Sequence, residues 1–338
     1  MTRRAFLHTT AATLATQTLM ADQTTEPAVQ YKMGIAATSY MGVWRPKDTY
    51  EFLEHCHTLG AAGIQSAFHG DLAKIRARAE QLGMYIEGMV PMPKGNDTGA
   101  FEEALKNAKD VGAVAVRSDC LGTRRYETFH SLEDWKEHVA ESKQSIAAAV
   151  PLLERYKIPL GLENHKDWTL DEAVALFEAH SSEYFGSCVD FGNNIALLDQ
   201  PMEVIKKLAP FAVCTHLKNM AVEPYQDGFL LSEVLLGDGY LDLNQAVATI
   251  RQHRPKVRFS LEMITRDPLE VPCLNDDYWI TFPDRNGLYL ARTLRFVNEH
   301  HSSQPLPRVS HLKHEEAMRV EEQNVVTCLR WAHQNLGL

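Results

Sequence analysis

The sequence contains no long hydrophobic run and few cysteines. None of its 338 residues belongs to a stretch of ~18 apolar residues, the length that a membrane-spanning helix needs. The six cysteines form no CxxC pair and no zinc-type spacing, so we expect them to be mostly buried thiols. Basic residues are outnumbered, with 34 Lys and Arg against 44 Asp and Glu and a formal charge of −10. An acidic chain repels a phosphate backbone, which argues against a nucleic-acid partner.

Two arginines near the start of the chain resemble part of an export signal. Arg3 and Arg4 precede a mildly apolar stretch from Phe6 to Met20, and Ala21 is a small residue suited to cleavage. The arrangement is similar to the twin-arginine signal of proteins that are exported already folded. It predicts a signal peptide over residues 1–21, a linker over 22–32, a periplasmic or otherwise exported location, and the twin-arginine export machinery as a partner.

Short apolar runs alternate with longer amphipathic runs from residue 33 onward. Eight strands, each followed by a helix, favour a (β/α)8 TIM barrel as a single domain over residues 33–301, with a doubly wound sheet as the alternative. The strand-like runs are residues 33–37, 63–68, 84–90, 113–117, 159–163, 186–190, 212–216 and 258–263. We expect the eighth barrel helix at 285–299. A C-terminal extension, 302–338, should add one further helix on the outside of the barrel.

Four of the predicted strands end in a side chain that commonly binds metal ions. Side chains alternate across a strand, so each of these residues shares a face with the residue two positions earlier. Those earlier residues are small, which leaves room at a barrel axis: they are Gly161, Cys188, Cys214 and Ser260. We therefore expect the four side chains to converge at the C-terminal mouth of the barrel, where barrel enzymes hold their active sites. They are Glu163, Asp190, His216 and Glu262.

Three carboxylates and one imidazole form a set of mainly oxygen ligands. Such a set suits one divalent ion, Mn²⁺, Mg²⁺ or Co²⁺ before Zn²⁺. Three acids converging in a barrel would be costly without a cation. The alternative is that Glu163 and Glu262 pair with Arg or Lys and that His216 is an ordinary core histidine.

These four residues resemble the metal set of the xylose isomerase-like superfamily of sugar isomerases and epimerases. The resemblance covers essentially the whole chain after the signal and implies a metal-dependent enzyme with a carbohydrate substrate, in a family whose members are often oligomers. It implies proton transfer beside a carbonyl through an enediolate, with Glu163 and Glu262 as base and acid. Two residues depart from the ketose 3-epimerase pattern, because Asn193 and Val222 replace a histidine and an arginine that hold substrate there.

Several residues near the predicted strand ends are candidates for contact with a substrate. Lys218, two positions after His216, resembles a lysine of inosose dehydratases and could donate a proton; a solvated loop lysine is the alternative. The candidates for substrate binding are His165, Arg266, His69 and Trp44, each with a packing or structural role as its alternative. Glu87 and Arg117 are expected to pair with each other across the barrel.

The candidate residues do not determine which reaction the protein catalyses. A metal-dependent isomerase or epimerase is the first expectation, and a lyase or dehydratase acting on a keto-sugar or inosose is the second. An exported sugar-binding barrel without catalytic activity is a third. An abasic-site endonuclease would need more histidines at strand ends and a basic groove, which the acidic sequence does not offer.

Overall fold

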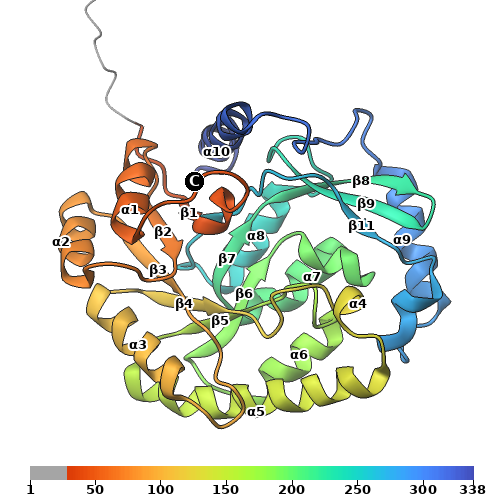
Figure 1. The fold of residues 1–338 in the computed structure, drawn as a ribbon, viewed down its shortest axis with the longest axis horizontal. Coiled ribbons are helices and arrows are strands. Elements are labelled where there is room, and N and C mark those ends of the chain that lie inside the picture. The colour runs from red at the N-terminus through yellow and green to blue at the C-terminus, as the bar shows by residue number, and fades with distance from the viewer. Residues whose placement is uncertain (1–28) are drawn as a thin grey trace, which may run out of the picture.

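The computed structural model describes residues 29–338 and contains a closed barrel of eight parallel strands (Figure 1). The predicted signal peptide and most of the linker lie outside these residues. The barrel order is β1-β10-β7-β6-β5-β4-β3-β2. The strands are β1 (Gly34–Ala36), β2 (Gly63–Ser66), β3 (Tyr85–Met89), β4 (Ala115–Ser118), β5 (Leu160–Glu163), β6 (Phe185–Asp190), β7 (Ala212–Leu217) and β10 (Ser260–Leu261). The predicted TIM barrel is thereby confirmed.

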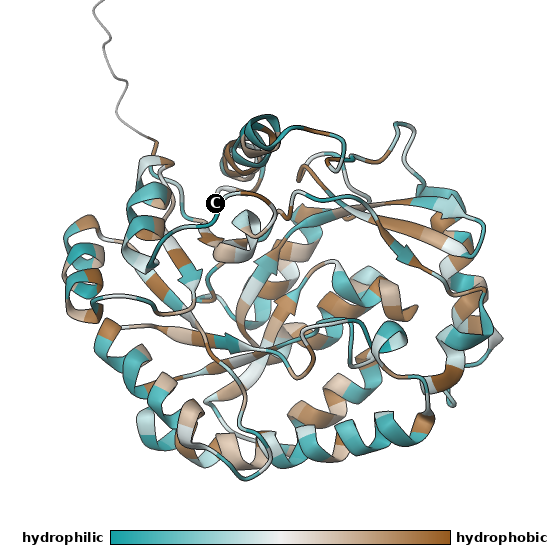
Figure 2. Ribbon diagram, viewed as in Figure 1, coloured by the Kyte–Doolittle hydropathy of each residue, from teal (hydrophilic) through white to brown (hydrophobic). Residues whose placement is uncertain are grey.

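Helices surround the barrel and turn their apolar faces toward it, as the brown strands and teal outer surfaces of Figure 2 show. They are α1 (Thr49–Thr58), α2 (Leu72–Leu82), α3 (Gly99–Val111), α5 (Leu132–Tyr156), α6 (Leu170–Ala179), α7 (Pro201–Leu208) and α8 (Leu243–His253). Local residues fix several of their ends. Thr169 and Glu172 form a capping box at the start of α6. Gly83 and Gly112 end α2 and α3 with φ of 67° and 75°, a backbone conformation that favours glycine.

The barrel interior below the mouth is narrow, as the small residues predicted. A Cβ at Gly161 would lie 2.8 Å from Sγ of Cys214 and 2.7 Å from the backbone nitrogen of Cys188. All six cysteines are free thiols, and all except the partly buried Cys120 are buried. Because the side chains at this level are small, the larger side chains at the strand ends have room to converge above them.

The eighth helical position of the barrel is filled by the C-terminal helix α10 (His314–Leu336), which corrects our assignment of residues 285–299. Helix α10 packs on α8, β10 and the 3-10 helix η1 (Ala37–Tyr40). Its residues Val325, Cys328 and Leu329 are fully buried in the main core. The helix expected at 285–299 is α9 (Gly287–His300), and it lies away from the barrel wall (Figure 1).

A second, antiparallel sheet follows β7, and the sequence analysis did not predict it. It consists of β8 (Asn219–Tyr225), β9 (Gly228–Val234) and β11 (Leu269–Val271) in the order β11-β9-β8. Helix α9 covers this sheet, and the two share a separate apolar core that includes Phe229, Leu231 and Val297. The remaining short helices are α4 (Arg125–Thr128), η2 (Asn193–Leu197), η3 (Ala209–Phe211) and η4 (Asp276–Thr281). Across residues 29–338, no helix combines the length and the apolar character needed to cross a membrane.

Candidate metal centre

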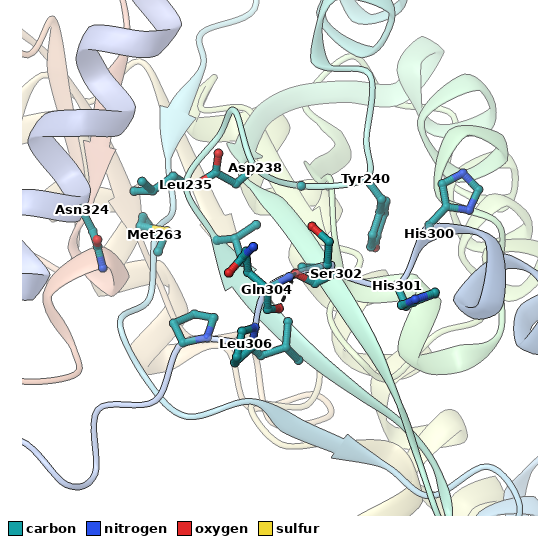
Figure 3. A pocket seen from close by; sticks show the side chains of 16 residues that line it. Leu235, Asp238, Tyr240, Met263, His300, His301, Ser302, Gln304, Leu306 and Asn324 are labelled. Atoms are coloured by element: carbon teal, nitrogen blue, oxygen red, sulfur yellow. Dashed lines mark hydrogen bonds between the residues drawn. The ribbon is translucent and has the colours of Figure 1, made fainter.

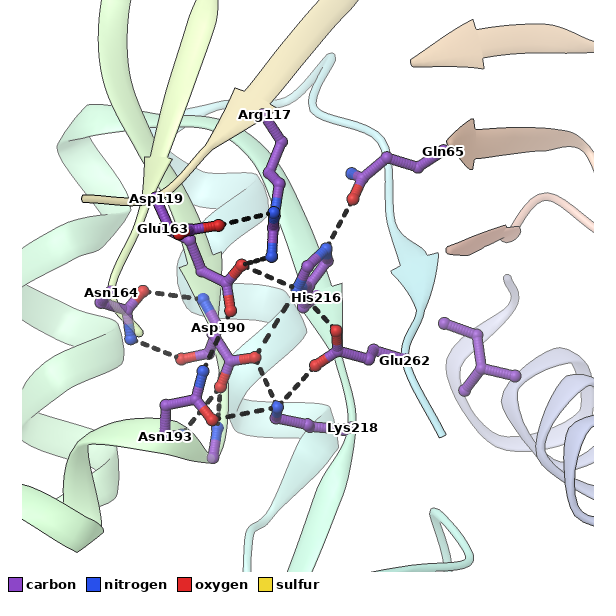
Figure 4. A network of polar contacts seen from close by, with 12 residues as sticks. Gln65, Arg117, Asp119, Glu163, Asn164, Asp190, Asn193, His216, Lys218 and Glu262 are labelled. Atoms are coloured by element: carbon purple, nitrogen blue, oxygen red, sulfur yellow. Dashed lines mark hydrogen bonds and ion pairs between the residues drawn. The ribbon is translucent and has the colours of Figure 1, made fainter. Parts of the chain in front are cut away.

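Glu163, Asp190, His216 and Glu262 meet at the C-terminal mouth of the barrel (Figure 4). Each offers one ligand atom, and these four atoms lie within 4.8 Å of one another. Nδ1 of His216 is 3.2 Å from a Glu262 oxygen, 3.6 Å from a Glu163 oxygen and 3.7 Å from an Asp190 oxygen. All four residues are buried. The sequence-based expectation that these side chains converge agrees with this geometry.

The pairing of the strands explains how the four residues reach one point. Asp190 on β6 lies directly beside His216 on β7. His216 in turn pairs with Ser260 on β10, so Glu262 is two residues further along and on the same face. Glu163 ends β5 beside Cys188, two residues before Asp190. Neighbouring strands are staggered by the shear of a closed barrel. Side chains of different length compensate for this stagger, so that their ends reach one point.

The ring of His216 is oriented by a chain of buried polar groups from β2 and β3. Its Nε2 lies 2.5 Å from Oε1 of Gln65, whose Nε2 donates to Glu87 at 3.0 Å. Since the Glu87 carboxylate accepts from the Gln65 amide nitrogen, the amide oxygen must face the histidine. Nε2 of His216 therefore carries a proton, and Nδ1 is the nitrogen that faces the three carboxylates and is available to a metal ion.

Two buried cations neutralise part of the negative charge. Nζ of Lys218 lies 2.7 Å from Asp190 and 2.6 Å from Glu262, and the Arg117 guanidinium pairs with Glu163 and with Asp119. Burial would raise the pKa of the Glu163 carboxyl, but Arg117 and then His216 outweigh burial and hold that pKa well below its ordinary value. Burial raises the pKa of Asp190 to about 6, against the opposing effect of Lys218.

The donor set fits a divalent metal ion. Nδ1 of His216 is buried without a hydrogen bond, and it faces Oε2 of Glu163 and Oδ2 of Asp190, whose only close polar partners among the described residues are the cations Arg117 and Lys218. Buried polar atoms in this state are unfavourable unless a further group satisfies them. A cation among three carboxylate oxygens and one imidazole nitrogen would do so, and such ligands are typical of Mn²⁺, Mg²⁺, Co²⁺ and Zn²⁺ sites.

A cavity of about 170 Å³ opens above the cluster toward solvent. Glu163 and Glu262 form part of its wall, and η1 contributes Thr38. The wall also includes three of the residues that the sequence analysis proposed as substrate contacts or proton donors: His165, Lys218 and Arg266. Arg266 is held in place because its guanidinium donates two hydrogen bonds to the buried Glu233, at 2.6 and 3.1 Å.

Two other proposed substrate contacts lie outside this cavity. Trp44 packs its ring against Tyr40 and His55, which favours the packing role that was its alternative. His69 lines a neighbouring apolar pocket of about 290 Å³, which shares Thr38 and Met41 with the cavity over the cluster. The structure therefore places neither side chain beside the four candidate ligands.

The expected pairing of Glu87 with Arg117 is wrong. Glu87 accepts hydrogen bonds from Gln65 and Ser260, while Arg117 points up the barrel to Glu163 and Asp119. Gln65 itself was missed, because a single glutamine within an apolar strand carries no motif. Asn193, noted only as a departure from a subfamily, donates to Glu163 at 3.0 Å and accepts from Lys166 at 2.5 Å.

A further hollow of about 620 Å³ lies between the β8–β9 hairpin and residues 300–307 (Figure 3). Its wall includes Tyr240, Met263, His301 and Leu306. None of the four candidate metal ligands lines it. This hollow is therefore separate from the candidate metal centre.

Comparisons with known proteins agree with the fold. The 3-oxo-isoapionate decarboxylase of Pectobacterium atrosepticum is 28% identical over 276 residues, which cover 76% of this chain and 95% of that protein. The solved IOLI protein with a bound zinc atom has a TM-score of 0.54 at 14% identity, over 88% of this chain and 98% of that one. The D-psicose 3-epimerase solved in the presence of D-fructose has a TM-score of 0.53 at 16% identity, over 79% and 97%. At these identities the two structures show the fold alone.

The family model of the xylose isomerase-like TIM barrel matches residues 53–281, from α1 to η4. The match includes β5, β6, β7 and β10 with all four candidate ligands. Because this match spans well over half of a chain whose strands close into the corresponding barrel, the protein belongs to the xylose isomerase-like TIM barrel family.

Proposed function

We propose that this protein is a divalent-metal-dependent enzyme that acts on a carbohydrate next to a carbonyl group. The observation that carries the proposal is the convergence of four buried ligand atoms within 4.8 Å, with Nδ1 of His216 facing the three carboxylates. The decarboxylase relative and the sugar epimerases that share the fold support an enzyme with a small carbohydrate substrate. A non-catalytic sugar-binding barrel would not need three acids held together at this cost.

Glu163, Asp190, His216 and Glu262 would hold the ion. Bound there, a divalent metal supplies a Lewis acid for a carbonyl oxygen and for the charge that develops on it. Arg117 and Lys218 keep the carboxylates of Glu163 and Glu262 in place through buried ion pairs. The burial of all these groups excludes bulk water, which strengthens their electrostatic effect on the substrate.

Among the possible reactions, we favour a lyase, and specifically loss of carbon dioxide from an oxidised sugar acid. An isomerase moves a proton between two carbons, and an epimerase moves it between two faces of one carbon. Both reactions need carboxylates that are free to take a proton. Here each oxygen of Glu163 and Glu262 already faces a buried partner: Asn193, Arg117, His216 or Lys218. Decarboxylation needs no such base, because the breaking carbon–carbon bond supplies the electron pair. The relative named for this reaction supports the choice.

An isomerase or epimerase is the second candidate. Glu163 and Glu262 come from β5 and β10, which are separated in the barrel by β6 and β7, so they approach the cluster from different strands. A substrate between them would have one carboxylate on each side, as epimerisation requires.

Metal analysis followed by product analysis tests the proposal. Purified protein would be stripped with EDTA, analysed for metals, and reloaded separately with Mn²⁺, Mg²⁺, Co²⁺ or Zn²⁺. Each form would then be incubated with 3-oxo-isoapionate and, in parallel, with D-fructose and D-psicose. We expect carbon dioxide from the first, whereas interconversion of the two ketoses would favour the epimerase. Glu262→Gln should lose turnover, and Glu270→Gln, an exposed glutamate on β11, is the matched control.

The enzymatic proposal fails if the protein binds none of these ions and chelation changes neither its activity nor its stability. We also propose that the protein acts outside the cytoplasm, since the two arginines before residues 6–20 resemble an export signal.

A further inference from the structure

Lys166 is a buried cation that has no acidic partner. It follows β5 in the wall of the cavity above the candidate metal ligands, and only 3% of its surface is exposed. Its Nζ has one hydrogen bond, to the Oδ1 atom of Asn193 at 2.5 Å. Asn193 is neutral, and the same oxygen also accepts from Lys218 at 3.2 Å. The ammonium of Lys166 is therefore only partly satisfied by the described residues around it.

The other cations of this cavity are paired. Arg117 contacts Glu163 and Asp119, Lys218 contacts Asp190 and Glu262, and Arg266 contacts Glu233. Arg124 contacts Glu127 at the rim. Within residues 29–338, no carboxylate oxygen lies within 4.0 Å of Lys166 Nζ. Among the lysines and arginines that line the cavity, Lys166 is the one whose counter-charge the described chain does not supply.

A buried ammonium without a counter-ion is costly, and a like charge nearby increases the cost. Burial, followed by the charges of Lys218 and Arg266, lowers the pKa of Lys166 to about 8. The orientation of Asn193 offers no relief, because its Nδ2 is committed to Glu163 at 3.0 Å. An anion entering the cavity that Lys166 lines would remove this cost.

We propose that Lys166 receives the carboxylate of the substrate, so that the enzyme acts on sugar acids rather than on neutral sugars. This inference rests on the proposed function and names the residue that recognises the acid group of the substrate. A carboxylate fits better than a phosphate for two reasons. The cavity of about 170 Å³ is smaller than the pockets that hold larger ligands. In addition, no residue from the start of α6 lines the cavity, so the free N–H groups of that helix are not available there to hold a phosphate.

The same placement suits a decarboxylation. The bond between the carboxylate carbon and its neighbour breaks, and carbon dioxide leaves. The electron pair of that bond remains on the substrate, which becomes an enediolate. Lys166 then faces the carbon that has lost the carboxylate and donates one proton to it. The resulting neutral amine regains a proton from solvent, so that the whole step is redox-neutral.

Binding measurements on the metal-loaded protein test this assignment. The probes are L-threonate, a four-carbon sugar acid, and erythritol, which has a carbon chain of the same length but no charge. We expect isothermal titration calorimetry to show about tenfold to hundredfold tighter binding of the acid, the effect of one charge-assisted hydrogen bond. Lys166→Met should abolish this preference, whereas Lys143→Met, at an exposed lysine on α5, should keep it.

The proposal is overturned if Lys166→Met keeps the preference for the acid, or if D-erythrose 4-phosphate binds the unmodified protein more tightly than L-threonate does. If Lys166→Met does not fold, the unmodified protein still decides the matter, because an equal affinity for L-threonate and erythritol contradicts the assignment. Metal content is measured on the same samples. Bound metal without an acid preference defeats this inference alone, whereas absence of metal binding defeats the proposed function.

Discussion

The amide oxygen of Gln65 lies 2.5 Å from Nε2 of His216, and the opposite end of that amide is anchored on Glu87. A residue of β2 thereby sets which nitrogen of a β7 histidine is free to bind a metal. Contacts of this kind behind a ligand hold its tautomer and its ring orientation.

Replacing Gln65 with leucine should weaken metal binding without touching any ligand. The variant Gln65→Leu removes the acceptor for Nε2, so His216 can turn or change tautomer. We expect metal affinity to fall by about tenfold to hundredfold, measured by competition with a metal-sensitive dye. Gln323→Leu, on the exposed face of α10, is the control and should bind as the parent does. Equal affinities of both variants would contradict the role of Gln65.

Arg117 should contribute more to the free energy of unfolding of the metal-free protein than to that of the metal-loaded protein. Arg117→Met leaves the buried Glu163 without its cation, which typically costs about 3–5 kcal/mol. A bound metal would supply a replacement charge, so the loss in free energy of unfolding should be smaller with Mn²⁺ than with EDTA. Urea denaturation measures both. Arg76→Met breaks an exposed pair with Glu80 and should cost less than about 0.5 kcal/mol in either condition. An equal loss for Arg117→Met in both conditions would contradict the coupling.

Helix α10 holds the loop that carries Thr38 and Met41 to the cavity. The carboxylate of Glu321 accepts hydrogen bonds from the backbone nitrogens of Val43, at 2.9 Å, and Trp44, at 2.7 Å. An amide can accept one of these bonds but opposes the other with its own N–H. We expect Glu321→Gln to lower the free energy of unfolding by about 2 kcal/mol and to speed amide exchange at Val43 and Trp44. Glu316→Gln, at an exposed position of the same helix, should change neither quantity.

The pH dependence of stability should reveal Asp167. This carboxyl is fully buried, one oxygen has no hydrogen-bond partner, and burial raises its pKa to about 8. A pKa that is higher in the folded state than in the unfolded state means that the group costs stability as pH rises between the two values. From about pH 5 to pH 8, the parent should therefore lose stability relative to Asp167→Asn. Urea denaturation of both proteins in EDTA measures the difference, and parallel curves would contradict the prediction, because they would mean that Asp167 ionises in the folded protein with an ordinary carboxyl pKa.

The export signal can be tested independently of the barrel. Replacing Arg3 and Arg4 together with lysine keeps the charge but alters the arginine pair that the signal requires. We expect the protein to accumulate in the cytoplasm, as shown by cell fractionation in a bacterial host. Arg45→Lys, beyond the signal, should leave the distribution unchanged. Equal export of both variants would mean that the two arginines are incidental.

The barrel and the convergence of four side chains were accessible from sequence because they follow local rules. Apolar alternation marks the strands, and a small residue two positions before each candidate ligand marks the face that points to the axis, as Gly161 does for Glu163. The placement of α9 and α10 was not accessible in this way. Both are amphipathic, and the order of elements along the chain does not reveal which of them covers β10.

Long-range polar contacts account for most of what the sequence did not reveal. Gln65 and His216 are 151 residues apart and neither lies in a motif with the other. The lack of an acidic partner for Lys166 likewise depends on where each acid of the cavity lies in space. The spacing of residues along the sequence does not reveal those positions. The strands β8 and β9 were not predicted, because β8 begins immediately after β7, where a barrel normally continues into a helix.

The place of α10 affects how the protein can reach its native state. Strands β1 and β10 complete the ring, but the helix that shields them from water is made only after α9 and the segment that follows it. A nascent chain without Val325, Cys328 and Leu329 would expose the apolar seam where the ring joins. Folding during synthesis would therefore stall at an open intermediate, and a protease or a chaperone would have its best access to the chain at that moment.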